Sequence, residues 1–330
     1  MEYTGDPYDE CTSAHVLECK WSAVASGYIE DDYIKYFGSG TKRGPLLNMR
    51  MFTIERISAI SVHFLRIKAI RWAVTAFADS FKDDALQFVN LGCGFDTLAL
   101  WILQNYKTFT CFELDLPARL EKKAAIMRRA KSIMELISEE ECKDAATIVP
   151  VDLTALDDIG EILKEFGYCP DKPTLFLSEC CLVYLDVMKS NEIIRTASAI
   201  CNRPSCFVYW EQELGTELVA TSTYPTIESQ MKRYENLGWE KVSIMDMNAM
   251  YNKMKLECLD GIEEMVIVCG HFVIGVCATE ADTFTELFKK MDQKDKPKKV
   301  KGYTTEEVLQ MIKNGTVSQM KPAPLSTEWL

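Results

Sequence analysis

Short apolar runs alternate with longer amphipathic segments through the middle of the chain. The apolar runs predict strands at 86–91, 109–114, 146–153, 174–178 and 206–210. The segments between them predict helices at 97–104, 117–136, 158–166 and 187–200. Strands that alternate with helices in this way are joined by crossover connections and therefore lie parallel to one another. The pattern predicts an α/β fold of the doubly wound type, with a mainly parallel sheet and helices on both faces.

Helical patterns precede this alternating region. Apolar residues recur at helical spacing from Pro45 to Phe81, which predicts one long helix. An amphipathic piece at 14–28 and an aromatic-rich piece at 31–37 predict a helical arm before it. The long helix carries four arginines, which we expect on its solvated face: Arg50, Arg56, Arg66 and Arg71.

The pattern continues beyond the last of these strands. It predicts a helix at 226–237, an extended segment at 240–247 and another helix at 248–255. The apolar stretch 265–279 contains Gly270 and Gly275, which predicts two strands or one bent strand. Because parallel sheets often gain antiparallel strands at one side, we expect these late strands to form an antiparallel edge.

Three regions follow from these patterns. Residues 1–80 are expected to form an N-terminal helical arm or lid, and residues 81–282 the core domain. Residues 283–330 are expected to form a basic and partly flexible extension, because a run of lysines begins at Lys289. Within that extension, a T-x-x-E capping box at Thr304 predicts one short helix.

Composition narrows the possible classes of protein. With 48% hydrophobic and 26% charged residues, the chain is typical of a globular protein. Its net charge of −12 disfavours non-specific binding to nucleic acid phosphates. The sequence contains no apolar signal region and no run of membrane-spanning length, so we expect a cytoplasmic protein. Its 13 cysteines and 3 histidines are scattered without a C-x-x-C motif, which favours buried free thiols and no metal site.

The stretch Leu86–Thr97 runs from a buried strand through Gly92-Cys93-Gly94 into a helix. Glycines at such a turn let the backbone bend sharply, and they let a ligand approach peptide N–H groups without a Cβ in the way. The third glycine of a dinucleotide-binding fingerprint is missing, which disfavours a nicotinamide cofactor. We predict that Gly92 and Gly94 contact a cofactor, although the pair also fits an ordinary tight turn.

Acidic residues follow the next three predicted strands. Asp115 lies about 20 residues after the glycines, the spacing of a carboxylate that binds ribose hydroxyls, and it is alternatively a helix cap. Asp152 and Leu153 suit adenine, because the carboxylate accepts from the exocyclic amine and Leu153 offers a backbone N–H. Glu179 is costly to bury without a cation, which we expect to be the ligand's own ammonium group. Together these residues predict a site for S-adenosylmethionine.

Longer motifs extend this picture. They include V-N-L-G-x-G-x-D-T at 89–97, F-E-x-D-x-P at 112–117, P-T-L-x-x-x-E-C-x-L-V-Y at 173–184, an aromatic-E-Q segment at 210–212 and G-W-E at 238–240. Two shorter motifs are C-K before G-Y in the N-terminal arm and the D-L pair at 152–153. With all of these motifs, the chain resembles the leucine carboxyl methyltransferase family over about residues 11 to 280.

The resemblance implies an enzyme that uses S-adenosyl-L-methionine to methylate the C-terminal leucine carboxylate of the protein phosphatase 2A catalytic subunit. That subunit is then the expected partner. The resemblance also implies a cofactor-binding set: Lys20, Arg56, Gly92, Asp115, Asp152, Leu153 and Glu179.

The R-G-Y-x-x-R motif of the family is not intact here, because Arg50 and Arg56 are six residues apart. Arg56 is the better match to its last arginine, since an isoleucine follows it and the long helix continues. Whether Lys20 or Arg56 serves the cofactor or the acceptor carboxylate stays open at this point. On the acceptor side we expect three further residues, with core packing or strand termination as the alternative role of each: Tyr184, Glu211 and Gln212.

Two other functions remain open from the sequence. One is a methyltransferase of the same superfamily that acts on a small molecule or on a modified tRNA. The other is a cofactor-binding protein without catalysis that serves as a phosphatase-interaction module. Methylation of a phosphatase that carries or lacks its terminal leucine distinguishes all three.

Overall fold

The structure, a computed structural model, describes most of the chain. It covers residues 7–38, 54–82, 84–140, 142, 144–155, 158–212, 223–254 and 269–292. The chain divides into two compact units, Met1–Asp292 and Gln293–Leu330. The second unit, and with it the helix predicted from Thr304, lies outside the described residues. Within the described ranges, every helix is too short or too polar to cross a bilayer.

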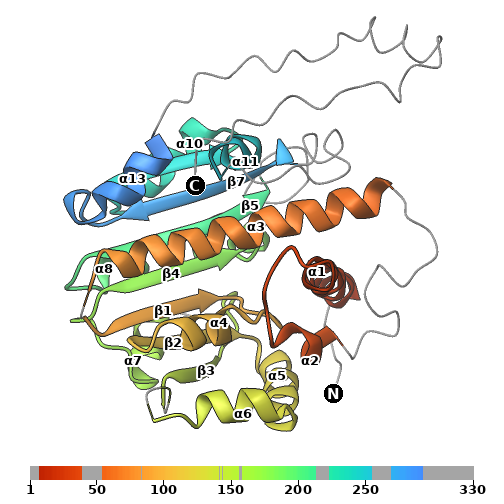
Figure 1. Cartoon of the computed structure of the whole chain (residues 1–330). Coiled ribbons are helices and arrows are strands. Elements are labelled where there is room, and N and C mark those ends of the chain that lie inside the picture. Colours follow the sequence, from red (N-terminus) through yellow and green to blue (C-terminus); the bar gives the residue numbers. More distant parts are fainter. Residues whose placement is uncertain are drawn as a thin grey trace, which may run out of the picture. The chain divides into compact units, whose positions relative to one another are not determined.

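A seven-stranded sheet forms the centre of the first unit, as far as that unit is described (Figure 1). Its strands are β1 (Leu86–Leu91), β2 (Phe109–Asp115), β3 (Ala146–Pro150), β4 (Thr174–Glu179), β5 (Ser205–Gln212), β6 (Lys241–Asp246) and β7 (Phe272–Ala278). The order is β3-β2-β1-β4-β5-β7-β6, and the first five strands in this order run parallel. This arrangement confirms the predicted doubly wound α/β fold.

The two late strands, β6 and β7, form the predicted antiparallel edge of the sheet. Strand β7 is antiparallel to both neighbours but lies between β5 and β6, so the edge of the sheet is β6. In the described part of the stretch 265–279, β7 is a single strand through Gly275. A Cβ at Gly275 would lie 2.0 Å from the Tyr209 ring. The glycine therefore makes room for a neighbouring aromatic side chain and does not mark a bend.

Helices cover the sheet. They are α1 (Pro7–Ala25), α2 (Ile34–Gly38), α3 (Ile54–Asp79), α4 (Leu98–Asn105), α5 (Pro117–Arg129), α6 (Lys131–Ile137), α7 (Ile159–Glu165), α8 (Val187–Ala199), α10 (Ile227–Asn236), α11 (Met247–Met254) and α13 (Thr285–Asp292). Two short 3₁₀ helices are η2 (Leu182–Tyr184) and η3 (Asp282–Phe284). The single helix predicted at 117–136 is wrong, because Ala130 adopts extended backbone angles between α5 and α6. Ala130 is buried in the core, and neither glycine nor proline marks the break in the sequence.

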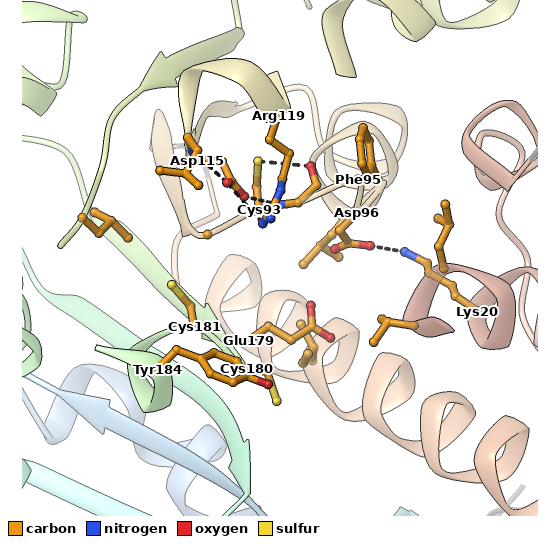
Figure 2. A pocket seen from close by; sticks show the side chains of 18 of the residues that line it. Lys20, Cys93, Phe95, Asp96, Asp115, Arg119, Glu179, Cys180, Cys181 and Tyr184 are labelled. Atoms are coloured by element: carbon orange, nitrogen blue, oxygen red, sulfur yellow. Dashed lines mark hydrogen bonds and ion pairs between the residues drawn. The ribbon is translucent and has the colours of Figure 1, made fainter. Parts of the chain in front are cut away.

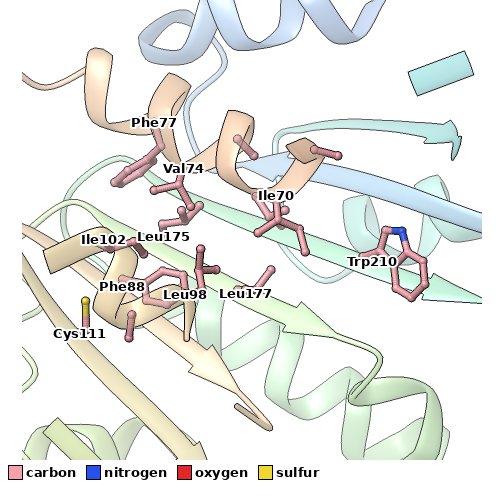
Figure 3. Packing of buried hydrophobic residues seen from close by; sticks show 14 of the residues in the cluster. Ile70, Val74, Phe77, Phe88, Leu98, Ile102, Cys111, Leu175, Leu177 and Trp210 are labelled. Atoms are coloured by element: carbon pink, nitrogen blue, oxygen red, sulfur yellow. The ribbon is translucent and has the colours of Figure 1, made fainter. Parts of the chain in front are cut away.

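Alternating side chains of the strands supply two separate cores. Phe88 of β1 and Leu175 of β4 pack with α3 and α4 on one face, together with Trp210 of β5 (Figure 3). Val89 and Phe176, one residue further along, pack on the opposite face beside α7, α8 and α10. Successive residues of a strand point to opposite faces, so strands buried on both sides are apolar almost throughout.

Helix α3 connects the N-terminal arm with the sheet (Figure 1). It packs against α1, β5, α11 and α13, and its buried stripe includes Leu65, Ile70, Val74 and Phe77. The described part of this helix begins at Ile54, and residues 45–53 of the predicted helix lie outside the description. Because α3 carries a charged residue, Arg66, beside its apolar stripe, the helix brings a cation into the interior.

Candidate functional site

A cavity of about 610 Å³ lies at the carboxyl ends of β1, β2, β3 and β4 (Figure 2). Strand β1 sits between β2 and β4, so the chain reverses its direction of winding at this point. Ligands of doubly wound sheets bind at such switch points. Side chains of α1 and α3 line the cavity from the other side. The cavity brings together eight of the predicted residues: Lys20, Gly92, Gly94, Asp115, Asp152, Leu153, Glu179 and Tyr184.

The two glycines of the turn are needed for different reasons. Both have positive φ, +69° at Gly92 and +50° at Gly94, a backbone conformation that favours glycine. A Cβ at Gly92 would lie 2.5 Å from the Cys181 Sγ, whereas a Cβ at Gly94 would meet open space. Gly92 therefore permits close packing of the turn on Cys181, and Gly94 leaves room at the cavity wall.

Asp115 ends β2 and connects it to the glycine turn. Its Oδ2 accepts the backbone N–H of Gly94 at 2.7 Å, and its Oδ1 accepts the backbone N–H of Leu116 at 2.7 Å. Arg119 of α5 places its Nη1 3.4 Å from Oδ1. The N-cap position of α5 is Leu116 and makes no side-chain cap, so Asp115 is not the helix cap considered above. Sequence reasoning missed Arg119, although its four-residue spacing from Asp115 suggests the pair.

Asp152 and Leu153 follow β3 at the far end of the cavity. The Asp152 Oδ1 accepts the backbone N–H of Thr154 at 2.9 Å and its hydroxyl at 2.6 Å. Asp152 is exposed, and Leu153 is buried beside it. The pair offers one oriented carboxylate and one apolar side chain at the end of the third parallel strand.

Lys20 of α1 is buried where the arm meets the glycine turn. Its Nζ donates to the Asp96 carboxylate and, at 2.9 Å, to the Thr97 Oγ1. Asp31 completes its surroundings, with Oδ2 3.5 Å from Nζ. Burial alone would raise the pKa of Asp96, but Lys20 and neighbouring donors outweigh it and lower that pKa to about 2. Asp96 is therefore ionised at any physiological pH.

Asp31 is a functional candidate that sequence reasoning missed. Its Oδ1 accepts two backbone N–H groups at 3.0 Å at the start of α2, those of Tyr33 and Ile34. Its Oδ2 accepts the Thr97 hydroxyl at 2.6 Å and Arg71 Nη2 at 3.2 Å. One carboxylate thus joins α2, α3 and the segment that follows the glycine turn. The aspartate stands just before an apolar helical segment, which is the only local signal that marks it.

A second buried ion pair, Lys123 with Glu113, contacts the backbone next to the glycine turn. The Lys123 Nζ donates to Glu113 Oε1 at 2.6 Å and to the backbone carbonyl of Asp96 at 2.8 Å. Lys123 has no exposed surface. Burial raises the pKa of Glu113. Burial alone would lower the pKa of Lys123, but the attraction of Lys123 to Glu113 and other anionic neighbours keeps that pKa above its ordinary value. Strand β2 carries two acidic residues, Glu113 and Asp115. Asp115 lines the cavity and Glu113 does not.

Glu179 meets a cation from the protein itself. Arg66 of α3 donates from Nε to Glu179 Oε1, and both side chains are largely buried. The Arg66 guanidinium also lies over the Trp210 ring, 4.2 Å from its centroid. The expectation that Arg66 and Arg71 lie on a solvated face is therefore wrong, since Arg71 binds Asp31 and stacks on Trp101. The sequence carries no signal for this, because the pairs join positions far apart in the chain.

The cysteines beside the cavity are poor nucleophiles. Cys180 and Cys181 follow β4 and line the cavity with Cys93. Burial raises the pKa of Cys180 to about 12 and raises those of Cys93 and Cys181 as well. Because the thiolate is the reactive form, these thiols are inert at neutral pH. Cys180 also has φ of +51°, which is uncommon for a residue with a side chain and fixes the backbone next to Glu179.

The four residues predicted on the acceptor side occupy different places. Tyr184 lines the cavity from η2 and is 57% exposed. Glu211 is buried behind η2 and hydrogen-bonds the backbone of Leu182 and Val183, so it does not line the cavity. The side chains of Gln212 in β5 and Arg56 in α3 lie outside the description. Their predicted roles stay predictions.

Glu211 is a buried carboxyl group with an unusually high pKa. Burial raises its pKa to about 7, and Arg233, the hydroxyl of Ser178 and the two backbone N–H groups of η2 only partly oppose this shift. The Ser178 Oγ lies 3.4 Å from Oε1. Glu211 therefore holds the turn that carries Tyr184, and it does so from the core.

Known proteins are similar to this chain in sequence. The model of a family described as leucine carboxyl methyltransferase matches residues 10–198. Leucine carboxyl methyltransferase 1 of Bos taurus is 26% identical over 297 residues, which cover 78% of this chain and 84% of that protein. The tRNA wybutosine-synthesizing protein 4 of Schizosaccharomyces pombe is 26% identical over 287 residues, which cover 77% of this chain and 40% of that protein.

Solved structures also resemble the chain. Phosphoethanolamine N-methyltransferase 2 of Haemonchus contortus, in complex with S-adenosyl-L-methionine, matches with 9% sequence identity and a TM-score of 0.40. The match covers 73% of this chain and 60% of that one.

Proposed function

Because the chain belongs to the leucine carboxyl methyltransferase family, we propose that it methylates the C-terminal leucine carboxylate of the protein phosphatase 2A catalytic subunit. S-adenosyl-L-methionine is the methyl donor in this proposal. One observation carries it: residues predicted for ribose, adenine and the amino acid part of this cofactor line a single cavity. These residues come from four strand ends and from the N-terminal arm.

The residues of the cavity fit this cofactor. A volume of about 610 Å³ lies within the range that small-molecule sites occupy. Asp115 would hold the ribose hydroxyls, Asp152 and Leu153 the adenine, and the Gly92–Gly94 turn would lie against the cofactor. When bound, the cofactor supplies an electrophilic methyl group on a sulfonium sulfur.

The acceptor needs no general base. A C-terminal carboxylate has a pKa of about 3.5, so it is already an anion at neutral pH. The protein must align one carboxylate oxygen with the methyl group and exclude water from both. The protonated thiols of Cys180 and Cys181 at the cavity wall do not compete as nucleophiles.

Methyl transfer to purified phosphatase catalytic subunit tests the proposal. We expect radioactivity from labelled S-adenosylmethionine to enter the subunit and to be released by mild alkali, as a carboxyl methyl ester requires. A subunit without its terminal leucine is the control and should stay unlabelled. Absent transfer, or equal transfer to both forms, would contradict the proposal.

The similarity to tRNA wybutosine-synthesizing protein 4 favours a second candidate, methylation of a carboxylate on a modified tRNA. The net charge of −12 argues against it, because an acidic surface repels RNA phosphates. Labelling of hypomodified tRNA in the same assay, without labelling of the phosphatase, would select this candidate.

A further inference from the structure

The short helix η2 and its flanking residues form part of one wall of the cavity (Figure 2). Cys181, Tyr184 and Leu185 line the cavity. The two residues between Cys181 and Tyr184, Leu182 and Val183, are buried. This η2 wall follows β4, whereas the candidates for ribose and adenine follow β2 and β3, on the other side of β1. An acceptor that enters beside the cofactor would therefore contact the η2 wall.

The N–H groups at the start of η2 are bonded by side chains of the sheet. Cys181, at the N-cap position, makes no side-chain cap. Ser178 of β4 accepts the Leu182 N–H at its Oγ, at 3.3 Å. The carboxyl group of Glu211 in β5 accepts the N–H groups of Leu182 and Val183. The backbone of η2 is therefore held by two neighbouring strands and not by a local cap.

Glu211 differs from the acids of the cavity in its charge partners. Asp115 and Glu179 each form an ion pair with an arginine. Among the residues that the structure describes, none forms an ion pair with Glu211. Arg233 of α10 attracts the carboxyl group from further away, and its guanidinium donates to two side chains of α8. No direct cation within this part of the chain thus keeps Glu211 ionised.

The charge of Glu211 changes near neutral pH, since burial raises its pKa to about 7. The described groups around it keep their charge states there. Burial raises the pKa of Tyr234 in α10 and those of Cys180 and Cys181 after β4, so these groups stay neutral. Arg233 stays protonated. Strand β7 places an apolar residue opposite Glu211.

Loss of this charge weakens the bonds to η2. The ionised carboxylate accepts both N–H groups and also the hydroxyl of Ser178, whose Oγ lies 3.4 Å from Oε1. Hydrogen bonds to a charged group are stronger than those to a neutral one. A protonated carboxyl group has turned one oxygen into a donor and has lost the charge that strengthens the other bonds. The η2 wall is therefore held more firmly above neutral pH than below it.

We propose that Glu211 is a positioning residue for the methyl acceptor and that it acts through η2. The proposal rests on the proposed function and assigns one wall of its acceptor subsite. Ionised Glu211 sets the backbone of η2, and this backbone carries Tyr184 at the cavity before the acceptor arrives. A wall that is set in advance costs less to order on binding. The acceptor therefore binds more tightly as Glu211 ionises, whereas the cofactor, whose ribose and adenine candidates lie at other strand ends, responds much less.

Calorimetry at two pH values tests the proposal. The probe is a peptide with the C-terminal sequence of the phosphatase catalytic subunit, with saturating S-adenosylhomocysteine present. Measurements at about pH 6 and about pH 8 lie on either side of the pKa of Glu211. We expect the wild type to bind the peptide about fivefold more tightly at the higher pH, as the difference between a charge-assisted and a neutral hydrogen bond implies. The carboxylate of the peptide is ionised at both values.

Two substitutions at this position separate charge from reach. Glu211→Gln keeps the shape of the neutral acid, and Glu211→Asp keeps a carboxyl group on a side chain one methylene shorter. Both variants should bind the peptide equally at the two pH values, with the affinity of the wild type at the lower pH. His63→Gln is the control, because His63 lines the cavity and histidines ordinarily titrate in this window. It should keep the pH dependence of the wild type.

Hydrogen exchange observes η2 without any peptide. The backbone amides of Leu182 and Val183 should exchange faster in Glu211→Gln than in the wild type at the higher pH, and equally fast in both at the lower pH. Faster exchange throughout the sheet would instead show a general loss of stability and would contradict a positioning role.

Three binding results would overturn the proposal. They are equal affinity of the wild type at both pH values, tighter binding at the lower pH, and a pH dependence that survives in Glu211→Gln. Failure of the proposed function has a different signature. The peptide would then bind at neither pH, which would also remove the acceptor role of Glu211, while exchange of the η2 amides would still depend on Glu211.

Discussion

Replacement of Gly92 by alanine should damage the turn more than the same change at Gly94. Both residues have positive φ, so each alanine costs about 1–2 kcal/mol of backbone strain. At Gly92 the new Cβ would also lie 2.5 Å from the Sγ and 2.9 Å from the Cβ of Cys181. Overpacking of this kind costs about 1–3 kcal/mol. We therefore expect a loss of about 2–5 kcal/mol for Gly92→Ala and about 1–2 kcal/mol for Gly94→Ala.

A double-mutant cycle with Cys181→Ala isolates the steric part. The substitution removes the Sγ, the atom nearest to the new methyl group, but keeps the Cβ at 2.9 Å. Cys181→Ala should therefore restore about 1 kcal/mol to Gly92→Ala and nothing to Gly94→Ala, since only residues in contact couple. Urea unfolding of all variants gives the free energies of unfolding. Equal stabilities of Gly92→Ala and Gly94→Ala, or no coupling with Cys181, would refute the reasoning.

Three other predictions follow from buried charges. The pKa of Glu211 is raised from 4.5 to about 7 in the native state. Between these pH values the native state keeps a proton that the unfolded state releases, so the native state loses about 3 kcal/mol of stability as the pH rises. Relative to wild type, Glu211→Gln should therefore gain stability between about pH 4.5 and pH 7 in urea unfolding, and a constant difference would exclude the shift. Lys123→Met should cost about 3–5 kcal/mol because it leaves Glu113 buried and unpaired, whereas Lys232→Met in an exposed pair should change the unfolding midpoint little. Asp115→Asn should weaken S-adenosylhomocysteine binding at least tenfold in calorimetry, and unchanged binding would remove Asp115 from the cofactor site.

Much of the fold was predictable from local patterns. The apolar runs of β1, β2 and β4 were predicted within one residue of their observed ends, because strands buried on both faces are apolar throughout. The break at Ala130 was not predictable, since tertiary packing and not a local breaker residue sets it. Gly275 was misleading for the same reason, because the Tyr209 ring beside it belongs to another strand.

The candidate site divides in the same way. Asp115, Asp152 and Glu179 were predicted because parallel strands place their carboxyl ends at one edge of the sheet, so position along the chain suffices to find them. Arg66 and Asp31 were missed, because a charge looks the same in the sequence whether it faces water or a buried partner. Their partners are Glu179 and Thr97, far away in the chain.

The sequence by itself therefore determined the order of the elements, the turn with Gly92 and Gly94, and the acids that surround the cavity. Those features depend on periodicity and on residues close in the chain. Only the tertiary structure decided which cation meets Glu179 and which carboxylate joins the N-terminal arm to the turn. Burial makes such pairs strong enough to fix the site, and the long-range contacts that bury them exist only once the chain has folded.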